Sequence, residues 1–219
     1  MCITKGEKNM KKFVNFLSIF RIATAFAIIP TMMFNWYLVT FILFALGAAS
    51  DWFDGYLARK YNCCSKLGGV LDHIGDKLLV CNALILLPFI PIDITFISTF
   101  YTPIANKLWF IIIPVILMID RELYISGLRE FLGTQKIEMP VPKARFSMGK
   151  IKTTIQMIAV AIIILAVSIH KIPSNQTLLF ILSKLPEIGI ACLWFALVAS
   201  LWSATQYTFT FAEKLKKIK

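Results

Sequence analysis

The chain alternates long apolar runs with short stretches rich in charge, proline or both. A helix that crosses a bilayer needs roughly 20 apolar residues. The runs here are of about that length, and most prolines fall at their edges, where a missing backbone N–H does least harm. The pattern predicts an all-α, polytopic membrane protein with six transmembrane helices. These helices are expected at about 22–36, 37–57, 70–91, 107–130, 154–171 and 187–209.

Residues 1–21 precede the first predicted span and carry four lysines ahead of an apolar stretch. Arg21 interrupts that stretch, and no small-residue cleavage site follows it, which disfavours a cleaved signal peptide. We expect an uncleaved amphipathic helix that lies at the membrane interface and leads into the first span. A single membrane domain, 1–219, would then comprise this helix, a six-helix bundle over 22–209 and a basic cytoplasmic tail over 210–219.

Composition indicates that lipid is the main solvent of this chain. Hydrophobic residues make up 58% of the sequence and charged residues 16%, whereas soluble domains carry about 25% charged residues. The formal net charge is +11. No basic segment stands apart from the apolar runs, so we expect no nucleic-acid partner, and anionic lipid and an anionic substrate are both open as partners. The five cysteines form no CxxC pair, so we expect free thiols in a reducing compartment.

The distribution of positive charge predicts the orientation in the membrane. With six spans, both termini share a side with the connections at 58–69 and 131–153. Each of the 23 lysines and arginines lies nearest that side except Lys107, Lys171 and Lys184. By the positive-inside rule, the termini and these two connections face the cytoplasm. We therefore expect a multi-pass protein of the inner (cytoplasmic) membrane.

Four aspartates stand close together near the cytoplasmic ends of the second and third predicted spans. Asp51 and Asp54 share a helical face because they are three residues apart, and Asp72 and Asp76 share one because they are four apart. The link at 60–67 is short, so the two helices must be antiparallel neighbours. The two acidic faces can therefore meet.

Such carboxylates repel one another strongly in a partly desolvated site. Protonation, basic partners or bound cations can relieve the repulsion. An all-oxygen ligand set suits Mg²⁺, Mn²⁺ or Ca²⁺ rather than zinc or copper, and two divalent ions would roughly neutralise four aspartates and clamp a phosphoryl group. The small residues Gly55, Ala58, Gly68 and Gly69 leave room for a ligand, although helix packing is an alternative role for the glycines.

The order and spacing of these residues resemble the signature of the CDP-alcohol phosphotransferase family. The signature begins at Asp51 with DWFDGYLAR, continues after eight residues with Gly68, and ends with Asp72 and Asp76 at intervals of four. Every fixed position of the family's motif is matched. The resemblance implies a membrane enzyme that uses divalent ions to move a phosphate-linked group from a CDP-activated donor to an alcohol.

The resemblance also implies a role for each residue of the motif. Asp51, Asp54, Asp72 and Asp76 would hold two divalent ions, Mg²⁺ or Mn²⁺. Asp76 would in addition be the catalytic general base that takes the proton of the acceptor hydroxyl. An opening run, NFLSIFR, resembles the family's N-terminal motif. The residues then expected at CDP-diacylglycerol are Asn15, Ser18, Gly55, Ala58, Arg59, Ser65 and Gly68.

A second charged set further along the chain contains Arg121, Arg129, Lys150 and Lys152. Arg121 lies about two turns inside a predicted span, where snorkelling to the interface explains it poorly. Together these residues would bind a phosphate through charge-assisted hydrogen bonds. The alternative is ordinary positive charge on the cytoplasmic side. An acceptor that itself carries a phosphate would account for the set.

The motifs RELYISGLRE, GKIKTTIQM and LWSATQY resemble the branch of the family whose acceptor is sn-glycerol 3-phosphate. His73 departs from that branch, which usually has proline there. The implied reaction transfers the phosphatidyl group of CDP-diacylglycerol to glycerol 3-phosphate, giving phosphatidylglycerophosphate and CMP, and the family resemblance suggests a homodimer.

Several alternatives to this reaction are open from the sequence. Within the family, the acceptor can be inositol phosphate, serine or phosphatidylglycerol. In a different class, an ion or metal transporter would use an intramembrane carboxylate site, although the four aspartates lie near one face rather than near the bilayer midplane. A structural membrane subunit would leave the four aspartates without a role.

Overall fold

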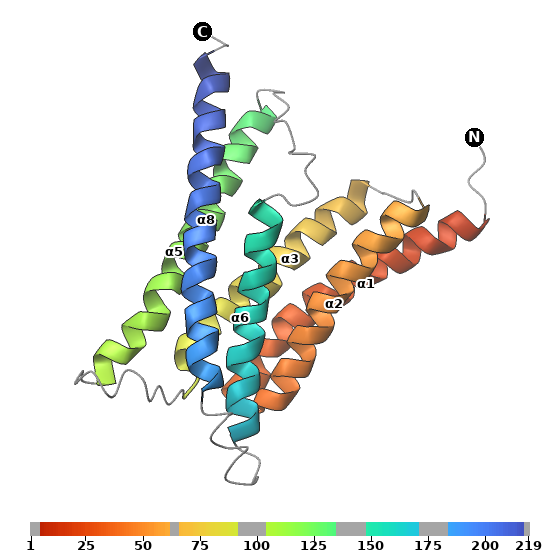
Figure 1. The fold of residues 1–219 in the computed structure, drawn as a ribbon. Helices are drawn as coiled ribbons and strands as arrows, with labels where there is room; N and C mark the ends of the chain where they lie inside the picture. The colour runs from red at the N-terminus through yellow and green to blue at the C-terminus, as the bar shows by residue number, and fades with distance from the viewer. Residues whose placement is uncertain (1–4, 62–65, 92–103, 135–147, 171–183, 217–219) are drawn as a thin grey trace. The chain divides into compact units, whose positions relative to one another are not determined.

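The computed structural model describes residues 5–61, 66–91, 104–134, 148–170 and 184–216. Within these ranges the chain is helical and contains no β-strand, which confirms the predicted all-α class. The helices, drawn in Figure 1, are α1 (Lys5–Met33), α2 (Tyr37–Tyr61), α3 (Lys66–Leu86), the short 3₁₀ helix η1 (Leu87–Phe89), α5 (Ile104–Thr134), α6 (Met148–His170) and α8 (Leu185–Lys216).

The chain forms two compact units. The first comprises Met1–Asp93 and Val160–Leu185, and the second comprises Ile94–Ala159 and Pro186–Lys219. α6 therefore contributes its C-terminal part to the first unit and its N-terminal part to the second. Each unit carries one of the two charged sets found in the sequence. The single membrane domain expected over 1–219 stays a prediction.

A tight turn joins α1 to α2. α1 continues through Pro30, and the backbone then turns at Asn35, which has a φ of 58°. Asparagine tolerates this left-handed region better than most residues. The backbone N–H groups of Phe34 and Trp36 donate to the carbonyls of Pro30 and Thr31, each at 2.9 Å. The turn therefore lies at the boundary between the first two predicted spans, and it sends α2 back along α1.

In the first unit, α1 packs against both α2 and α3. The hydroxyl of Thr40 donates to that of Thr31 at 3.0 Å, which links α2 to α1. The side-chain amide of Asn82 donates to the carbonyl of Ala25 at 2.9 Å, which links α3 to α1. The buried core of these three helices is mainly aliphatic. It contains Ala25, Ile28, Met32, Phe44, Leu79, Ala83 and Leu84.

Two glycines set how closely these three helices approach one another. A Cβ added at Gly47 would lie 2.9 Å from both Leu79 Cδ2 and Thr24 Oγ1. A Cβ added at Gly75 would lie 3.4 Å from Arg21 Cδ. The contact at Gly47 is too short for carbon, so a larger residue there would make either these side chains or the helices shift. Close helix packing in membranes commonly uses small residues in this way.

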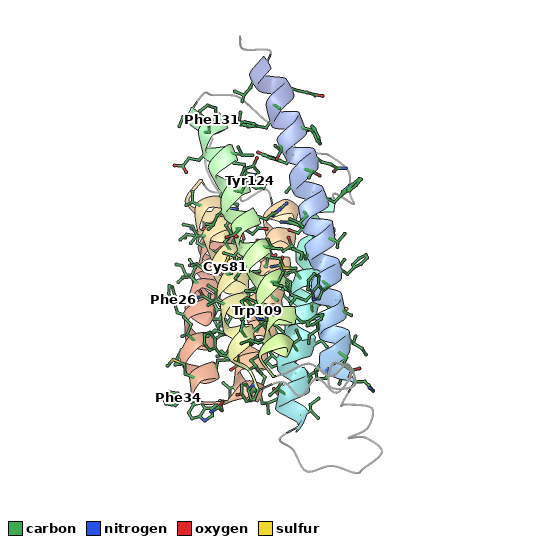
Figure 2. The ribbon with its side chains drawn as sticks, turned by 90° about the vertical axis from the view of Figure 1, so that its left-hand side faces the viewer. Phe26, Phe34, Cys81, Trp109, Tyr124 and Phe131 are labelled. Atoms are coloured by element: carbon green, nitrogen blue, oxygen red, sulfur yellow. The ribbon has the colours of Figure 1, made fainter. Side chains whose placement is uncertain are left out.

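In the second unit, α5 and α8 run parallel to each other. Near their N-terminal ends, the indole N–H of Trp194 donates to the carbonyl of Phe110 at 3.0 Å. Further along, the hydroxyl of Tyr124 lies 3.3 Å from a threonine hydroxyl of α8. The rings of Phe131 and Phe211 pack with their centroids 6.0 Å apart. Tyr124 and Phe131 follow one another along α5 in Figure 2. These contacts hold the two helices in one register over most of their length.

Large apolar side chains remain on the outside of the helices, as expected where lipid replaces water. Phe26 and Phe34 are more than half exposed and point outward from the first unit (Figure 2). Among the described residues, four helical segments are long and apolar enough to cross a membrane, so the chain is a helical membrane protein. α3 and α5 interrupt their apolar runs with charged residues, and the count of six spans stays a prediction. The four segments are Phe13–Met33, Tyr37–Asp54, Lys152–Ile169 and Leu185–Glu213.

Two of the predicted boundaries fall inside continuous helices. α1 runs without a break across the expected junction between 1–21 and the first span, and the first candidate span begins at Phe13. Arg21 lies within this helix, where the structure buries it and pairs it with carboxylates although a charge is costly in lipid. α8 continues into the expected tail at 210–219 as far as Lys216, because no proline or glycine occurs between Ile190 and Lys216. The interfacial helix stays a prediction.

Candidate functional site

Arg21 of α1 lies among three carboxylates of α2 and α3. Its Nη1 is 2.9 Å from Asp51 Oδ1 and 2.8 Å from Asp72 Oδ1, and its Nη2 pairs with Asp54 Oδ2. Its Nε donates to the hydroxyl of Ser50 at 3.4 Å. Each nitrogen of the guanidinium therefore has a partner on a neighbouring helix. We call Arg21, Asp51, Asp54 and Asp72 the Arg21 cluster.

The members of the Arg21 cluster differ sharply in exposure. The side chains of Arg21 and Asp54 are 0% and 4% exposed, whereas those of Asp51 and Asp72 are 41% and 49% exposed. The cluster thus has a sealed end, where Arg21 meets Asp54, and an open end, where two carboxylates share Nη1. A charged pair that is buried must be well satisfied to be tolerated, and the sealed end meets this requirement. The open end is accessible to a ligand.

The sequence of α1 explains why Arg21 points inward. Ser18, Arg21, Ala25, Ile28 and Met32 follow one another at intervals of three or four and are all buried. This spacing defines one face of a helix. Because the face is small or aliphatic except at Arg21, packing of α1 on α2 and α3 carries the guanidinium to the acidic ends of those helices.

The three aspartates of the cluster can hold a divalent ion. Each offers one carboxylate oxygen, and these oxygens of Asp51, Asp54 and Asp72 all lie within 4.8 Å of one another. Oxygen ligands of this kind suit Mg²⁺, Mn²⁺ or Ca²⁺, and the guanidinium among them is already a cation in contact with the same oxygens. Asp76 follows Asp72 by one turn on α3 and is half-buried. The arrangement is compatible with divalent metal binding.

The residues expected at CDP-diacylglycerol are described in part. Ser18 is buried and its hydroxyl donates to the carbonyl of Val14 at 3.3 Å, within its own helix. Asn15 is half-buried on α1, and Gly68 is buried on α3. Ser65 lies outside the described residues. The remaining expected residues belong to α2, but their side chains lie outside the description. They are Gly55, Ala58 and Arg59.

In the second unit, Glu122 of α5 lies between two cations. Its Oε1 is 2.8 Å from Arg121 Nη1 and also pairs with Nζ of Lys152 on α6. Arg121 Nη2 donates to the hydroxyl of Ser203 on α8 at 3.2 Å. We call Arg121, Glu122, Lys152 and Ser203 the Glu122 cluster. Two of the four basic residues predicted to bind phosphate thus meet at one carboxylate, and the side chain of Lys150 lies outside the described residues.

Further polar residues of the second unit lie one helical turn from members of this cluster. Gln156 follows Lys152 by one turn on α6, and Tyr207 follows Ser203 by one turn on α8. The guanidinium of Arg129 lies over the ring of Tyr207, 5.5 Å from its centroid. Among the described residues of the second unit, three buried side-chain atoms have no hydrogen-bond partner, which is costly unless a ligand or water satisfies them. They are Arg121 Nε, Gln156 Nε2 and the hydroxyl of Tyr207.

Several of these residues did not emerge as site residues from the sequence. Arg21 entered only as an interruption of an apolar run and the end of a motif, although an arginine on a buried helical face is itself a sign of an internal partner. Glu122 stands next to Arg121 in the sequence, but the sequence does not indicate that this carboxylate joins Arg121 to Lys152. His73 is exposed. Among the described cysteines, Cys192 is a free thiol, as predicted.

Long apolar helices and a carboxylate-rich cluster define this chain as a helical membrane protein with a site suited to divalent ions. Comparison with known families makes the assignment specific. The chain belongs to the CDP-alcohol phosphatidyltransferase family, whose model matches residues 12–202. This confirms the family predicted from the aspartate motif.

Individual relatives agree with this family. A Rickettsia bellii protein named CDP-diacylglycerol–glycerol-3-phosphate 3-phosphatidyltransferase is 39% identical over 155 residues, covering 69% of this chain and 74% of the relative. A Salmonella paratyphi A protein of the same name is 31% identical over 194 residues, covering 87% of this chain and 90% of the relative. The similarity therefore extends over most of both proteins.

Proposed function

We propose that this chain catalyses the reaction for which these relatives are named. It transfers the phosphatidyl group of CDP-diacylglycerol to sn-glycerol 3-phosphate, giving phosphatidylglycerophosphate and CMP on the route to phosphatidylglycerol. The observation that carries the proposal is the relatives' common name at 31% to 39% identity over most of the chain. The matched region, 12–202, also includes Arg21, the motif aspartates and both predicted phosphate-binding residues of the Glu122 cluster.

The chemistry assigned to the Arg21 cluster and Asp76 is nucleophilic displacement at phosphorus. The C1 hydroxyl of glycerol 3-phosphate attacks the phosphorus that carries the diacylglycerol, and the bond from that phosphorus to the CMP oxygen breaks. We assign the proton of the attacking hydroxyl to the carboxylate of Asp76, which stands one turn from Asp72 on the same face of α3. A carboxylate within hydrogen-bonding reach of the nucleophile is the usual form of such a base.

We assign Asp51, Asp54, Asp72 and Asp76 to two divalent ions, Mg²⁺ or Mn²⁺. When bound, such ions neutralise charge on the pyrophosphate and on the departing phosphate. The open end of the Arg21 cluster supports this assignment, because Asp51 and Asp72 are accessible there and their oxygens lie within 4.8 Å of each other and of Asp54. The donor's nucleotide is assigned to the surrounding motif residues, Asn15, Ser18, Gly55, Ala58, Arg59, Ser65 and Gly68.

The phosphate of the acceptor is assigned to the Glu122 cluster. Arg121 and Lys152 supply two cations that already contact one carboxylate oxygen, as they would contact a phosphate oxygen. Arg129 and Lys150 are assigned to the same acceptor on the sequence motif. The buried polar atoms of Gln156 and Tyr207, which have no partner in the described part of the chain, add donors suited to the hydroxyl groups of a polyol.

The topology proposed for this enzyme follows the sequence prediction. Six transmembrane helices would form one domain of the inner membrane, with an interfacial helix before them and both termini in the cytoplasm. The concentration of lysine and arginine on one side supports this orientation. Membrane lipid surrounds the bundle, and the protein is proposed to work as a homodimer. Labelling of single introduced cysteines from either side of the membrane would test the orientation.

The test of the reaction is acceptor-dependent release of CMP. Purified protein in detergent receives CDP-diacylglycerol with glycerol 3-phosphate, inositol phosphate, serine or phosphatidylglycerol, first with Mg²⁺ or Mn²⁺ and then with chelator. We expect CMP with glycerol 3-phosphate alone, and only when a divalent ion is present. Release with another acceptor in its place would overturn the acceptor assignment, and undiminished release in chelator would overturn the role of metal.

A further inference from the structure

Arg21 occupies the place at which the proposed divalent ions must find ligands. Its guanidinium is fully buried and contacts three carboxylates on two helices. It is also anchored independently of the open end, through Ser50 at Nε and Asp54 at Nη2. A side chain held in this way cannot leave the cluster without losing its only described partners in a buried setting, which is energetically costly.

We propose that Arg21 stays in the cluster as a resident counterion, competes with divalent ions for Asp51 and Asp72, and thereby makes full ion loading depend on the anionic nucleotide. The inference rests on the metal site of the proposed function. Its geometric basis is that Asp51 and Asp72 share one nitrogen, Nη1, at the exposed end, while Asp54 keeps Nη2 at the sealed end. Ions therefore take the exposed carboxylates from Arg21, and Arg21 remains with Asp54 and Ser50.

A count of charge explains the dependence on nucleotide. The four motif aspartates carry four negative charges, and Arg21 reduces this to a net of three. Two divalent ions would leave the site with one excess positive charge, which disfavours the second ion in a partly desolvated cluster. A pyrophosphate carries negative charge into the same place and removes the excess. Without Arg21, two ions would balance the four aspartates and need no nucleotide.

The experiment is a titration of the purified protein with Mn²⁺, with free ion followed by electron paramagnetic resonance, in the absence and presence of CDP. In wild-type protein we expect CDP to tighten Mn²⁺ binding by about tenfold, a coupling typical of linked sites. In Arg21→Gln we expect Mn²⁺ alone to bind about tenfold more tightly than to wild type, because a positive charge in contact with its ligands is gone. CDP should then add less than about threefold.

Two further variants separate competition from loss of structure. Asn82→Ala removes a hydrogen bond between the same two helices, α1 and α3, without touching a carboxylate, and it should leave the Mn²⁺ midpoint and the effect of CDP unchanged. Ser50→Ala releases only Nε of Arg21. It should tighten Mn²⁺ binding two- to threefold, about what a weakened neutral hydrogen bond allows. If Arg21→Gln folds neither with nor without Mn²⁺, Ser50→Ala becomes the test of whether Arg21 competes with Mn²⁺.

The outcomes are distinct. Tighter Mn²⁺ binding with a smaller CDP effect in Arg21→Gln supports the proposal, as does folding of that variant only when Mn²⁺ is present. An unchanged or weaker Mn²⁺ midpoint in Arg21→Gln overturns it, and so does an unchanged midpoint in Ser50→Ala where the first variant cannot be measured. If wild-type protein binds no Mn²⁺ and releases no CMP, the proposed function itself has failed. That result comes from wild-type protein alone, so it is distinguishable from a failure of the Arg21 proposal.

Discussion

The two charge clusters of this protein are opposite in sign and similar in arrangement. In the Arg21 cluster one cation contacts three carboxylates, and in the Glu122 cluster one carboxylate contacts two cations. Each central charge is thus a counterion supplied by the chain itself. The centres differ in exposure, because the side chain of Arg21 is 0% exposed and that of Glu122 is 25% exposed. We infer that Arg21 is retained when ligands bind, whereas Glu122 can be replaced by an incoming anion.

This difference predicts a division of labour between the clusters. The Arg21 cluster, together with Asp76, should control the chemical step, since the ions and the general base act at the phosphorus that is transferred. The Glu122 cluster should control affinity for the acceptor, since it holds the acceptor's own phosphate, which does not react. Substitutions in the Arg21 cluster or at Asp76 should therefore lower kcat. Substitutions in the Glu122 cluster should raise KM for glycerol 3-phosphate.

The largest effect is expected from Asp76→Asn. An amide cannot accept the proton of the attacking hydroxyl, so kcat for CMP release should fall by about 10³-fold, while KM for glycerol 3-phosphate stays within about threefold. Steady-state kinetics of the purified variant provide the measurement. Asp120→Asn, at an exposed position on α5, is the matched control and should keep wild-type kcat. Near wild-type CMP release from Asp76→Asn would remove Asp76 from the mechanism.

A smaller effect, and one of a different kind, is expected from Lys152→Gln. Loss of one charge-assisted hydrogen bond to phosphate is worth about 1.5–3 kcal/mol, so KM for glycerol 3-phosphate should rise at least tenfold. KM for CDP-diacylglycerol should not change. Lys184→Gln, an exposed lysine just before α8, is the control. If both KM values rose together, Lys152 would serve the fold or the donor rather than the acceptor.

The packing that brings Arg21 to its acids can be tested with a pair of glycines. Gly47→Ala would place a Cβ 2.9 Å from Leu79 and Thr24, and such overpacking costs about 1–3 kcal/mol. We expect the melting temperature to fall by several degrees and CMP release to fall with it. Gly127→Ala has no atom within 4 Å of the added carbon and should melt at the wild-type temperature or above, because alanine favours helix. Equal melting temperatures would mean that α1, α2 and α3 tolerate a wider separation.

The smallest effect is expected from Glu122→Gln, which removes the internal anion of the basic cluster. Without phosphate the variant should be slightly less stable, since Arg121 and Lys152 lose their shared partner. Inorganic phosphate should then bind a few-fold more tightly and raise the melting temperature more than it does in wild type. Thermal unfolding in phosphate, against chloride at equal ionic strength, measures this. An identical phosphate response in both proteins would show that Glu122 does not compete with the acceptor.

Periodicity and motif spacing were enough to predict the helical class and to place the acidic residues on facing helices. The i, i+3 and i, i+4 spacings put Asp51 with Asp54 and Asp72 with Asp76, and the structure brings Asp51, Asp54 and Asp72 together. The family assignment followed from the same residues and is confirmed. These features are local in sequence, so one sequence is enough to reveal them.

The counterions could not be predicted in the same way. Arg21 lies 51 positions from Asp72, and Lys152 lies 30 positions from Glu122. Such pairs depend on how helices pack, and that packing depends on contacts such as those at Gly47. A charge inside an apolar run indicates that a partner exists, but it does not indicate which residue the partner is.

The account depends most on the transfer of a phosphatidyl group to glycerol 3-phosphate. The direct measurement is incorporation of radiolabel from sn-glycerol 3-phosphate into extractable lipid by purified protein supplied with CDP-diacylglycerol and Mg²⁺. We predict labelled phosphatidylglycerophosphate in amounts equal to the CMP released, and formation about 10³-fold slower with Asp76→Asn. Release of CMP without label in the lipid, or labelled lipid from Asp76→Asn at the wild-type rate, would contradict the account.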